Sequence, residues 1–330
     1  MPAVMSRVRR QGSVLGVVLL GVVAGCSGED LSKVNYERTT VGAEARADGG
    51  EVPSGPIDDP AVTQEALRAV DPCALLDGPA VAGLTAAEDA REVDWGVCRR
   101  PMLDAEGRQV SIWVDLGETN ASPSDASGGV GGLPLVELSN DGTCYMTAVT
   151  ETDQELGISV WADYDTDVGV ACDTGTSVLR GVVEVLRTGP PRYRAPADSL
   201  VNVDPCTLVT AEMLGHAFDG EVILRRAGLH GCVFEQDRAT LRLTMRVGYP
   251  VDPEEGTEVA LTDRVTAVAE KGDGDMLECD LSWRHRKVAE YDTELVELSY
   301  YAHPDTPGNE AACERVAGVA RGVAAAIPGA

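Results

Sequence analysis

The spacing of the cysteines constrains the fold of this chain more than any other feature. Eight of the nine cysteines fall into two sets of four, and the intervals are 25, 46 and 28 residues in the first set and 26, 47 and 34 in the second. The two sets are Cys73, Cys98, Cys144 and Cys172, and Cys206, Cys232, Cys279 and Cys313. A pattern repeated at about 133 residues predicts two tandem copies of one structural unit.

The residues around the cysteines repeat as well. Val-Asp-Pro-Cys occurs at 70–73 and again at 203–206, and the third cysteine of each set follows a turn signal, Asn-Asp-Gly or Gly-Asp-Gly. The repeat divides the chain into an expected first domain at 61–187, a linker with two adjacent prolines at 188–195, and a second domain at 196–330.

Eight cysteines allow 105 pairings, and the sequence does not choose among them. If each copy folds independently, three pairings per copy remain. We favour first with second and third with fourth, which gives Cys73–Cys98, Cys144–Cys172, Cys206–Cys232 and Cys279–Cys313. Zinc binding is the competing interpretation, but no close Cys-x-x-Cys pair is present, so we expect disulfides and no metal or other cofactor.

The first 25 residues have the features of an export signal. Arg7, Arg9 and Arg10 precede a short uncharged apolar run at 14–23. The run ends in Val-Ala-Gly before Cys26, which resembles a bacterial lipobox. We therefore expect residues 1–25 to be removed and Cys26 to carry a lipid that anchors the chain to the outer face of the cell membrane. The alternative is ordinary secretion with cleavage after Gly25, which would leave a free thiol at the ninth cysteine.

The composition indicates a flexible stalk, a strongly negative net charge and the kind of organism from which the chain comes. Residues 26–60 are rich in Gly, Asp, Glu and Ser without periodicity, and we expect a flexible stalk. The net charge is -27, and removing three signal-peptide arginines leaves -30, which argues strongly against nucleic-acid binding. Three lysines stand against 24 arginines. This bias is typical of high-GC genomes and indicates an actinobacterium.

Hydrophobic periodicity predicts an α+β domain with an antiparallel sheet in each copy. Asp71 and Asp204 are expected N-caps with proline at the first helical position, and short helices are expected through 81–84 and 211–218. Residues with a period of two predict strands, and residues with helical spacing close each copy. The expected strands are 110–116, 144–148, 158–161, 241–249, 279–283 and 296–300, and the expected closing helices are 178–186 and 316–327.

Two further expectations concern how each copy is completed. The fourth cysteine lies near the closing helix, so its disulfide would fix that helix to the strand of the third cysteine. Residues 255–270 are ambiguous between helix and strand, whereas 119–138 read as a Gly/Ser-rich loop followed by a strand.

These motifs together resemble a family of domains of unknown function found in actinobacterial lipoproteins, often as one copy behind a lipobox. The resemblance rests on Asp-Pro-Cys, four spaced cysteines, the lipobox and the closing helix, and it covers about 61–187 and 196–330. It implies an extracytoplasmic α+β domain and carries no activity with it. This chain departs from the family's pattern by having two copies.

No catalytic arrangement stands out, and we expect that the chain is not an enzyme. All four histidines, His216, His230, His285 and His303, lie in the second copy, where we expect surface residues. The glycine run 128–132 lacks the spacing of a phosphate loop and is expected to be a mobile loop. Asp163, Asp165 and Asp167 begin like a calcium loop, but Val168 and Thr174 occupy the sixth and twelfth positions, so only weak calcium binding stays open.

The remaining functional candidates are exposed aromatic side chains. Trp113 alternates with Ile112 and Val114, which places it on the opposite strand face, either exposed or covered by a helix. The aromatic residues of interest are Trp95, Trp113, Trp161, Trp283, Tyr300 and Tyr301. We expect a surface-tethered binding or sensory module for an envelope protein, glycan or lipid. The alternatives are a structural spacer and, further from the sequence features, an enzyme or enzyme accessory acting on envelope substrates.

Overall fold

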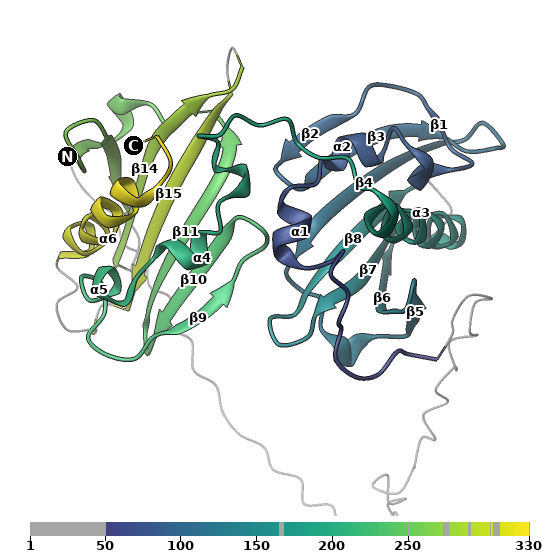
Figure 1. Ribbon diagram of the computed structural model, residues 1–330, viewed down its shortest axis with the longest axis horizontal. Helices are drawn as coiled ribbons and strands as arrows, with labels where there is room; N and C mark the ends of the chain where they lie inside the picture. Colours follow the sequence, from purple (N-terminus) through teal and green to yellow (C-terminus); the bar gives the residue numbers. More distant parts are fainter. Residues whose placement is uncertain are drawn as a thin grey trace, which may run out of the picture. The chain divides into compact units, whose positions relative to one another are not determined.

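The computed structural model describes residues 51–164, 168–249, 251–272, 277–289, 292–303, 305 and 311–329, so Cys26 and the signal sequence lie outside the described residues. Within these ranges the chain is mostly β, with two antiparallel sheets of eight and seven strands and few helices (Figure 1). The expected antiparallel sheets are therefore present, and the helical share is smaller than the sequence indicated. Among the described residues, no helix is both long enough and apolar enough to cross a membrane.

The first sheet has the strand order β1-β3-β4-β8-β7-β6-β5, and β2 pairs with β3 beside β1. Its strands are β1 (Thr85–Ala86), β2 (Arg91–Asp94), β3 (Val97–Leu103), β4 (Gln109–Glu118), β5 (Gly128–Val130), β6 (Leu133–Asn140), β7 (Thr143–Glu151) and β8 (Leu156–Asp163). The expected strands at 110–116, 144–148 and 158–161 are confirmed as the central strands β4, β7 and β8.

The second sheet has the order β12-β13-β14-β15-β11-β10-β9. Its strands are β9 (Ile223–Arg226), β10 (Gly231–Gln236), β11 (Ala239–Gly248), β12 (Thr257–Ala260), β13 (Thr266–Lys271), β14 (Leu277–Lys287) and β15 (Thr293–Ala302). The expected strands 241–249, 279–283 and 296–300 are confirmed as β11, β14 and β15, and the ambiguous segment 255–270 contains β12 and β13 rather than a helix.

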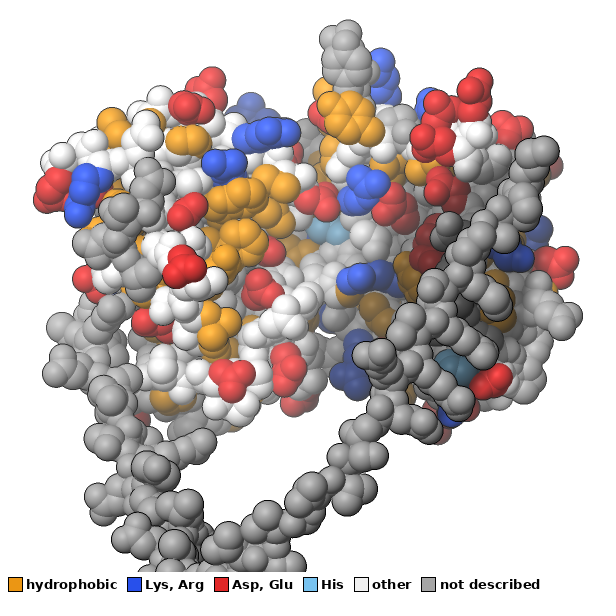
Figure 2. Space-filling view, turned by 180° about the vertical axis from the view of Figure 1, so that it is seen from behind, with side chains coloured by type: hydrophobic (Ala, Val, Ile, Leu, Met, Phe, Trp, Pro, Cys, Tyr) orange, Lys and Arg blue, Asp and Glu red, His pale blue; other side chains and the backbone are white. Residues whose placement is uncertain are grey.

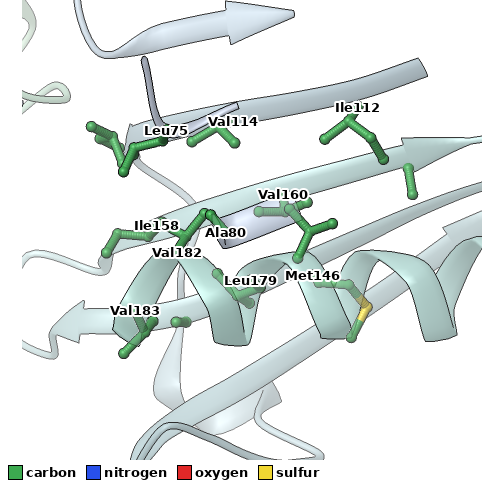
Figure 3. Packing of buried hydrophobic residues seen from close by; sticks show 14 of the residues in the cluster. Leu75, Ala80, Ile112, Val114, Met146, Ile158, Val160, Leu179, Val182 and Val183 are labelled. Atoms are coloured by element: carbon green, nitrogen blue, oxygen red, sulfur yellow. The ribbon is translucent and has the colours of Figure 1, made fainter. Parts of the chain in front are cut away.

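One long helix packs on one face of each sheet. The helices are α1 (Gln64–Arg68), α2 (Pro72–Leu75), α3 (Val168–Thr188), α4 (Pro205–Leu208), α5 (Ala211–Leu214) and α6 (Ala312–Ala326). Figure 3 shows Leu179 and Val182 of α3 beside Met146 and Val160 of the first sheet. These side chains are fully buried, so the space between α3 and the sheet is packed with aliphatic residues.

Each closing helix is joined to its sheet by a disulfide. Cys144 of β7 bonds Cys172 of α3, and Cys279 of β14 bonds Cys313 of α6. The other two bonds, Cys73–Cys98 and Cys206–Cys232, join the short helices α2 and α4 to β3 and β10. These are the four pairs that the sequence analysis favoured. On a chain-entropy estimate, crosslinks that close loops of this length contribute about 3–4 kcal/mol each.

The start of each copy follows the expected capping device. The Asp71 carboxylate accepts hydrogen bonds from the backbone N–H groups of Cys73 and Ala74, and Asp204 accepts one from Cys206. The helices that follow are shorter than expected. Pro79–Val81 form a single 3-10 turn, and 81–84 contain no α-helix. In the second copy α5 ends at Leu214, so the expectation of a helix to 218 was too long.

Two glycine-containing segments had different outcomes: the turn predicted at 140–142 is confirmed, and the loop predicted at 128–132 is not. Asp141 and Gly142 form a two-residue hairpin loop between β6 and β7, and both have positive φ, which is the geometry that Asp-Gly favours. In contrast, Gly128–Val130 form strand β5, which pairs with β6, so the expected mobile loop at 128–132 was wrong there. Backbone pairing with the edge of the sheet outweighed the flexibility of the glycines.

The end of the expected stalk packs on the first copy. The Asp59 carboxylate forms an ion pair with Arg187 near the end of α3, at 2.7 Å. Ile57 is partly buried against the core of the first sheet. Residues 51–60 are therefore held by contacts that the composition of this segment did not indicate.

Each copy also inserts one side chain into the core of the other. Trp95, before β3, is buried among the core residues of the second sheet, and Leu229, before β10, is buried in the core of the first. Both residues lie three positions before the second cysteine of their copy, Cys98 or Cys232. The exchange is therefore reciprocal and follows the repeat.

Polar contacts surround these two insertions. The buried Arg68 donates from Nε to the carbonyl oxygen of Leu229 at 3.0 Å and forms an ion pair with Asp204 at 3.1 Å. Tyr193, in the linker, donates its hydroxyl to Glu92 at 2.6 Å and accepts the backbone N–H of Gly96. The contact between the two copies, here called the junction, is thus formed by the two inserted apolar side chains and by side-chain hydrogen bonds around them.

Replacing Trp95 tests how much the junction contributes to stability. The Trp95→Ala change removes a side chain that is 8% exposed and leaves a cavity, so we expect a loss of about 3–5 kcal/mol in the free energy of unfolding. Urea unfolding followed by circular dichroism measures the loss. Val93→Ala is the control, because Val93 is 49% exposed two residues away. Equal effects of the two changes would contradict a structural role for the exchange.

Candidate functional site

An aromatic row crosses the first sheet on the face opposite to α3. In order across β3, β4, β8, β7 and β6, the aromatic row consists of Arg99, Trp113, Trp161, Tyr145 and Leu138, which are direct partners in the strand registers. Register partners point to the same face of a sheet. Their neighbours along each strand, such as Ile112 and Val114, point to α3 and are fully buried. The sequence prediction that Trp113 lies on the opposite face is confirmed.

The rings of the aromatic row pack against one another. The ring centres of Trp113 and Trp161 are 5.4 Å apart with a tilt of 33°, and those of Tyr145 and Trp161 are also 5.4 Å apart with a tilt of 60°. The Arg99 guanidinium lies over the Trp113 ring at 5.2 Å and donates from Nε to the Ser111 hydroxyl at 3.0 Å. A cation above an aromatic face is a stabilising contact.

Hydrogen bonds beside the aromatic row, on the same face of the sheet, hold the central ring. Trp161 donates from Nε1 to the hydroxyl of Ser159 at 2.9 Å, and Thr147 donates to the same oxygen at 3.0 Å. Ser159 and Thr147 are buried. The indole N–H of Trp161 is therefore satisfied by a hydrogen bond within the protein.

The outer end of the aromatic row is open to solvent. Tyr145 is 37% exposed and Leu138 is 61% exposed, while the two tryptophans are partly exposed. Figure 2, seen from behind the view of Figure 1, shows hydrophobic side chains gathered on that face with acidic and basic side chains around them. Exposed apolar patches with a polar surround are typical of interaction sites.

The second copy provides an internal comparison for the aromatic row. Alignment on Cys98 and Cys232 and the strand registers places Arg242, Ser299, Asp280 and Glu270 at the positions of Trp113, Trp161, Tyr145 and Leu138. The second sheet therefore forms with charged and polar residues where the first has aromatic and aliphatic ones. The fold does not require the aromatic row.

A carboxylate lies beside the aromatic row. Asp115 follows Trp113 by two residues on the same face of β4, and its Oδ1 accepts the backbone N–H of Gly117 at 2.7 Å. Burial, helped by the nearby carboxylates of Glu118 and Asp94, raises the pKa of Asp115 to about 6, although the Gly117 hydrogen bond opposes the shift. Near neutral pH this group titrates, which sequence reasoning did not foresee.

The four histidines differ in their burial. His216 is exposed as expected, His303 is half-buried, and His285 contacts the carbonyl oxygen of Asp198 at 2.8 Å. His230 is buried at the junction with its ring centre 5.0 Å from that of Trp95, so the surface expectation was wrong for it. Neither ring nitrogen has a hydrogen-bond partner among the described residues. Burial lowers the pKa of His230 to about 3, and it stays neutral.

The other candidates do not form a catalytic or metal site in the described part of the chain. Trp283 and Tyr300 are core residues of the second sheet. The Asp163 carboxylate accepts a hydrogen bond from Thr143, while Asp165 and Asp167 of the possible calcium loop lie outside the described residues. Glu137 lies near the sulfur atoms of Cys144 and Cys172, but those atoms form a disulfide and offer no thiolate.

Comparison with known proteins leaves the family open. No protein-family model and no curated protein matches this sequence. Two solved structures are similar over most of the chain at 14% and 16% identity. They are the di-domain ARO/CYC BexL from the BE-7585A biosynthetic pathway, covering 82% of this chain and 96% of its own, and DynU16 from the dynemicin biosynthetic locus, covering 83% and 94%. The TM-scores are 0.18 and 0.16, so neither likeness supports an argument.

The pH dependence of stability tests the environment of Asp115. A folded pKa above the unfolded value of 3.8 means that the charged form is disfavoured by folding. Stability from this group is therefore present at low pH and is lost as the pH rises through about 6. We expect Asp115→Asn to raise stability at pH 8 by on the order of 1–3 kcal/mol and to have little effect at pH 4.

Thermal unfolding of both proteins across this pH range measures the effect. The low pKa of His230 opposes that of Asp115, because it reduces stability as the pH falls below 6.5, but this contribution is common to both proteins and cancels in the difference. A difference that does not change with pH would contradict the raised pKa of Asp115.

Proposed function

We propose that the chain is an extracytoplasmic lipoprotein that acts as a binding module, with the aromatic row of the first sheet as its contact surface. The observation that carries this proposal is the difference between the two copies. The same sheet positions are apolar and partly exposed in the first copy and charged or polar in the second. Tryptophan, tyrosine and arginine are also the residues most enriched where binding energy concentrates at protein interfaces.

The location proposed for the protein has two supports. Four disulfides are typical of proteins in oxidising compartments outside the cytoplasm. The lipobox ending at Cys26 supports a lipid anchor, and the two signals agree. The ligand-binding part would then be tethered by the residues between Cys26 and the first sheet.

The anchor is tested by replacing its attachment atom. We expect Cys26→Ser to abolish incorporation of labelled palmitate and to release the protein into the medium, because a serine hydroxyl does not form the thioether. Immunoblots of membrane and medium fractions measure the change. Cys73→Ser is not a suitable control because Cys73 forms a disulfide, so a signal-sequence change that keeps the cysteine, Gly25→Ala, serves instead. Labelling of the Cys26→Ser protein would contradict the anchor.

The contact surface is tested in the native envelope. We expect a photo-crosslinking residue at Leu138 to yield a saturable adduct, and we expect Trp113→Ala with Trp161→Ala to reduce its yield at least about tenfold, a loss of roughly 1.4 kcal/mol. Arg242→Ala with Ser299→Ala is the matched control, because it changes the same two sheet positions in the second copy. Circular dichroism confirms that each variant is folded. The absence of a saturable adduct, or an equal loss in the control, would reject the aromatic row as the contact surface.

A further inference from the structure

The face that carries the aromatic row is complementary to itself. Arg91 of β2 is the register partner of Arg99, so one end of the row is extended by a second arginine, while the other end is Leu138. Arginine and aliphatic or aromatic residues thus occupy opposite ends of a line that crosses six strands at a spacing of about 4.8 Å. If a second copy of this face packs on the first in the reversed order, unlike side chains lie opposite each other.

A twofold axis parallel to the strands, between β4 and β8, produces this reversal. Such an axis turns the face over and reverses the strand order, while each residue keeps its height along its strand. Trp113 then faces Trp161 of the second copy, Arg99 faces Tyr145, and Arg91 faces Leu138. Two sheets packed in this way have nearly aligned strands, which is a common arrangement for face-to-face sheets.

The polar residues beside the row fit the same axis. Ser111 and Asp163 are register partners on β4 and β8, so the axis places the Ser111 hydroxyl opposite the Asp163 carboxylate of the second copy. The exposed Asp163 carboxylate therefore meets a hydroxyl donor and not a second carboxylate at this position. The alternative axis, perpendicular to the strands, would place Arg99 against Arg99, with repulsion between like charges.

We propose that this protein forms a homodimer through the aromatic row, with the twofold axis between β4 and β8. The inference rests on the proposed function, because it takes the aromatic row to be a contact surface and identifies the partner as a second copy of this chain. The contact buries four apolar side chains per copy, Trp113, Trp161, Tyr145 and Leu138, and places the Arg99 guanidinium over Tyr145 of the second copy. Symmetric dimers with one shared patch are the commonest assemblies of identical chains.

The sedimentation behaviour of the mature chain carrying Cys26→Ser tests the dimer without the lipid. We expect a concentration-dependent dimer in 0.15 M salt, with a dissociation constant below about 1 mM. Tyr145→Asp with Leu138→Glu should weaken it at least about tenfold. These changes introduce the residue types that the second sheet carries at Asp280 and Glu270, so the fold tolerates them. Asp280→Ala with Glu270→Ala is the control and should leave the dimer unchanged.

A charge exchange tests the direction of the axis. Arg99→Asp and Tyr145→Arg each remove the expected contact, and together they create an Arg–Asp pair between copies, so the double variant should recover the dimer. The two positions lie three strands apart in one chain, so this recovery does not arise within a copy. A monomer at every concentration, a dimer insensitive to Tyr145→Asp with Leu138→Glu, or failure of the double variant to recover would overturn the proposal.

The same variants separate this inference from the proposed function. If the chain is a monomer and Trp113→Ala with Trp161→Ala still removes a saturable envelope adduct, the row binds another molecule and only the dimer is rejected. If the chain is a monomer and no saturable adduct forms, both proposals fail.

Discussion

The bond between each closing helix and its sheet is the constraint on which the rest of the structure depends. Only two phenylalanines and 4% aromatic residues are available, so both cores consist mainly of valine, leucine and alanine. Such side chains bury little area each. Cys144–Cys172 and Cys279–Cys313 fix the long helices α3 and α6 over the sheets, which lets small side chains fill the space between them. With one face of each sheet covered in this way, the opposite face is left for other contacts.

Comparison of the two copies shows which positions need one kind of residue for the fold and which positions accept different kinds. Positions that face the helices carry the same kind of residue in both copies, as with Val114 and Leu243 opposite the second cysteines. Positions on the opposite face differ in kind, aromatic in one copy and charged or polar in the other. The junction lies between these cases, since Trp95 and Leu229 differ in size but are inserted in the same way. The two copies thus share the character of their cores and differ on their outer faces.

The sequence predicted the repeat, the capping aspartates and the central strands, because each depends on local pattern or spacing, and the cysteine pairs that we favoured are present. The predictions from sequence failed where contacts between residues distant in sequence determine the secondary structure or the burial. Gly128–Val130 read as a loop, yet pairing with β6 makes them a strand. His230 read as a surface residue, yet the junction buries it. The aromatic row was visible only in part, because alternation shows that Trp113 faces away from the core but not that Trp161 and Tyr145 lie beside it. Strand order supplies that information, and strand order is not written in local periodicity.

The large negative charge explains how an exposed aromatic row is compatible with solubility. A net charge of -27 makes chance encounters between molecules repulsive, which opposes nonspecific association of the patch. Arg99 in the row and Arg91 beside it reduce that repulsion locally, so only a partner that aligns with them gains from contact. Tethering would strengthen this selection, because molecules held at one membrane face meet at a high effective concentration and in a limited range of orientations. A weak but specific contact would then suffice.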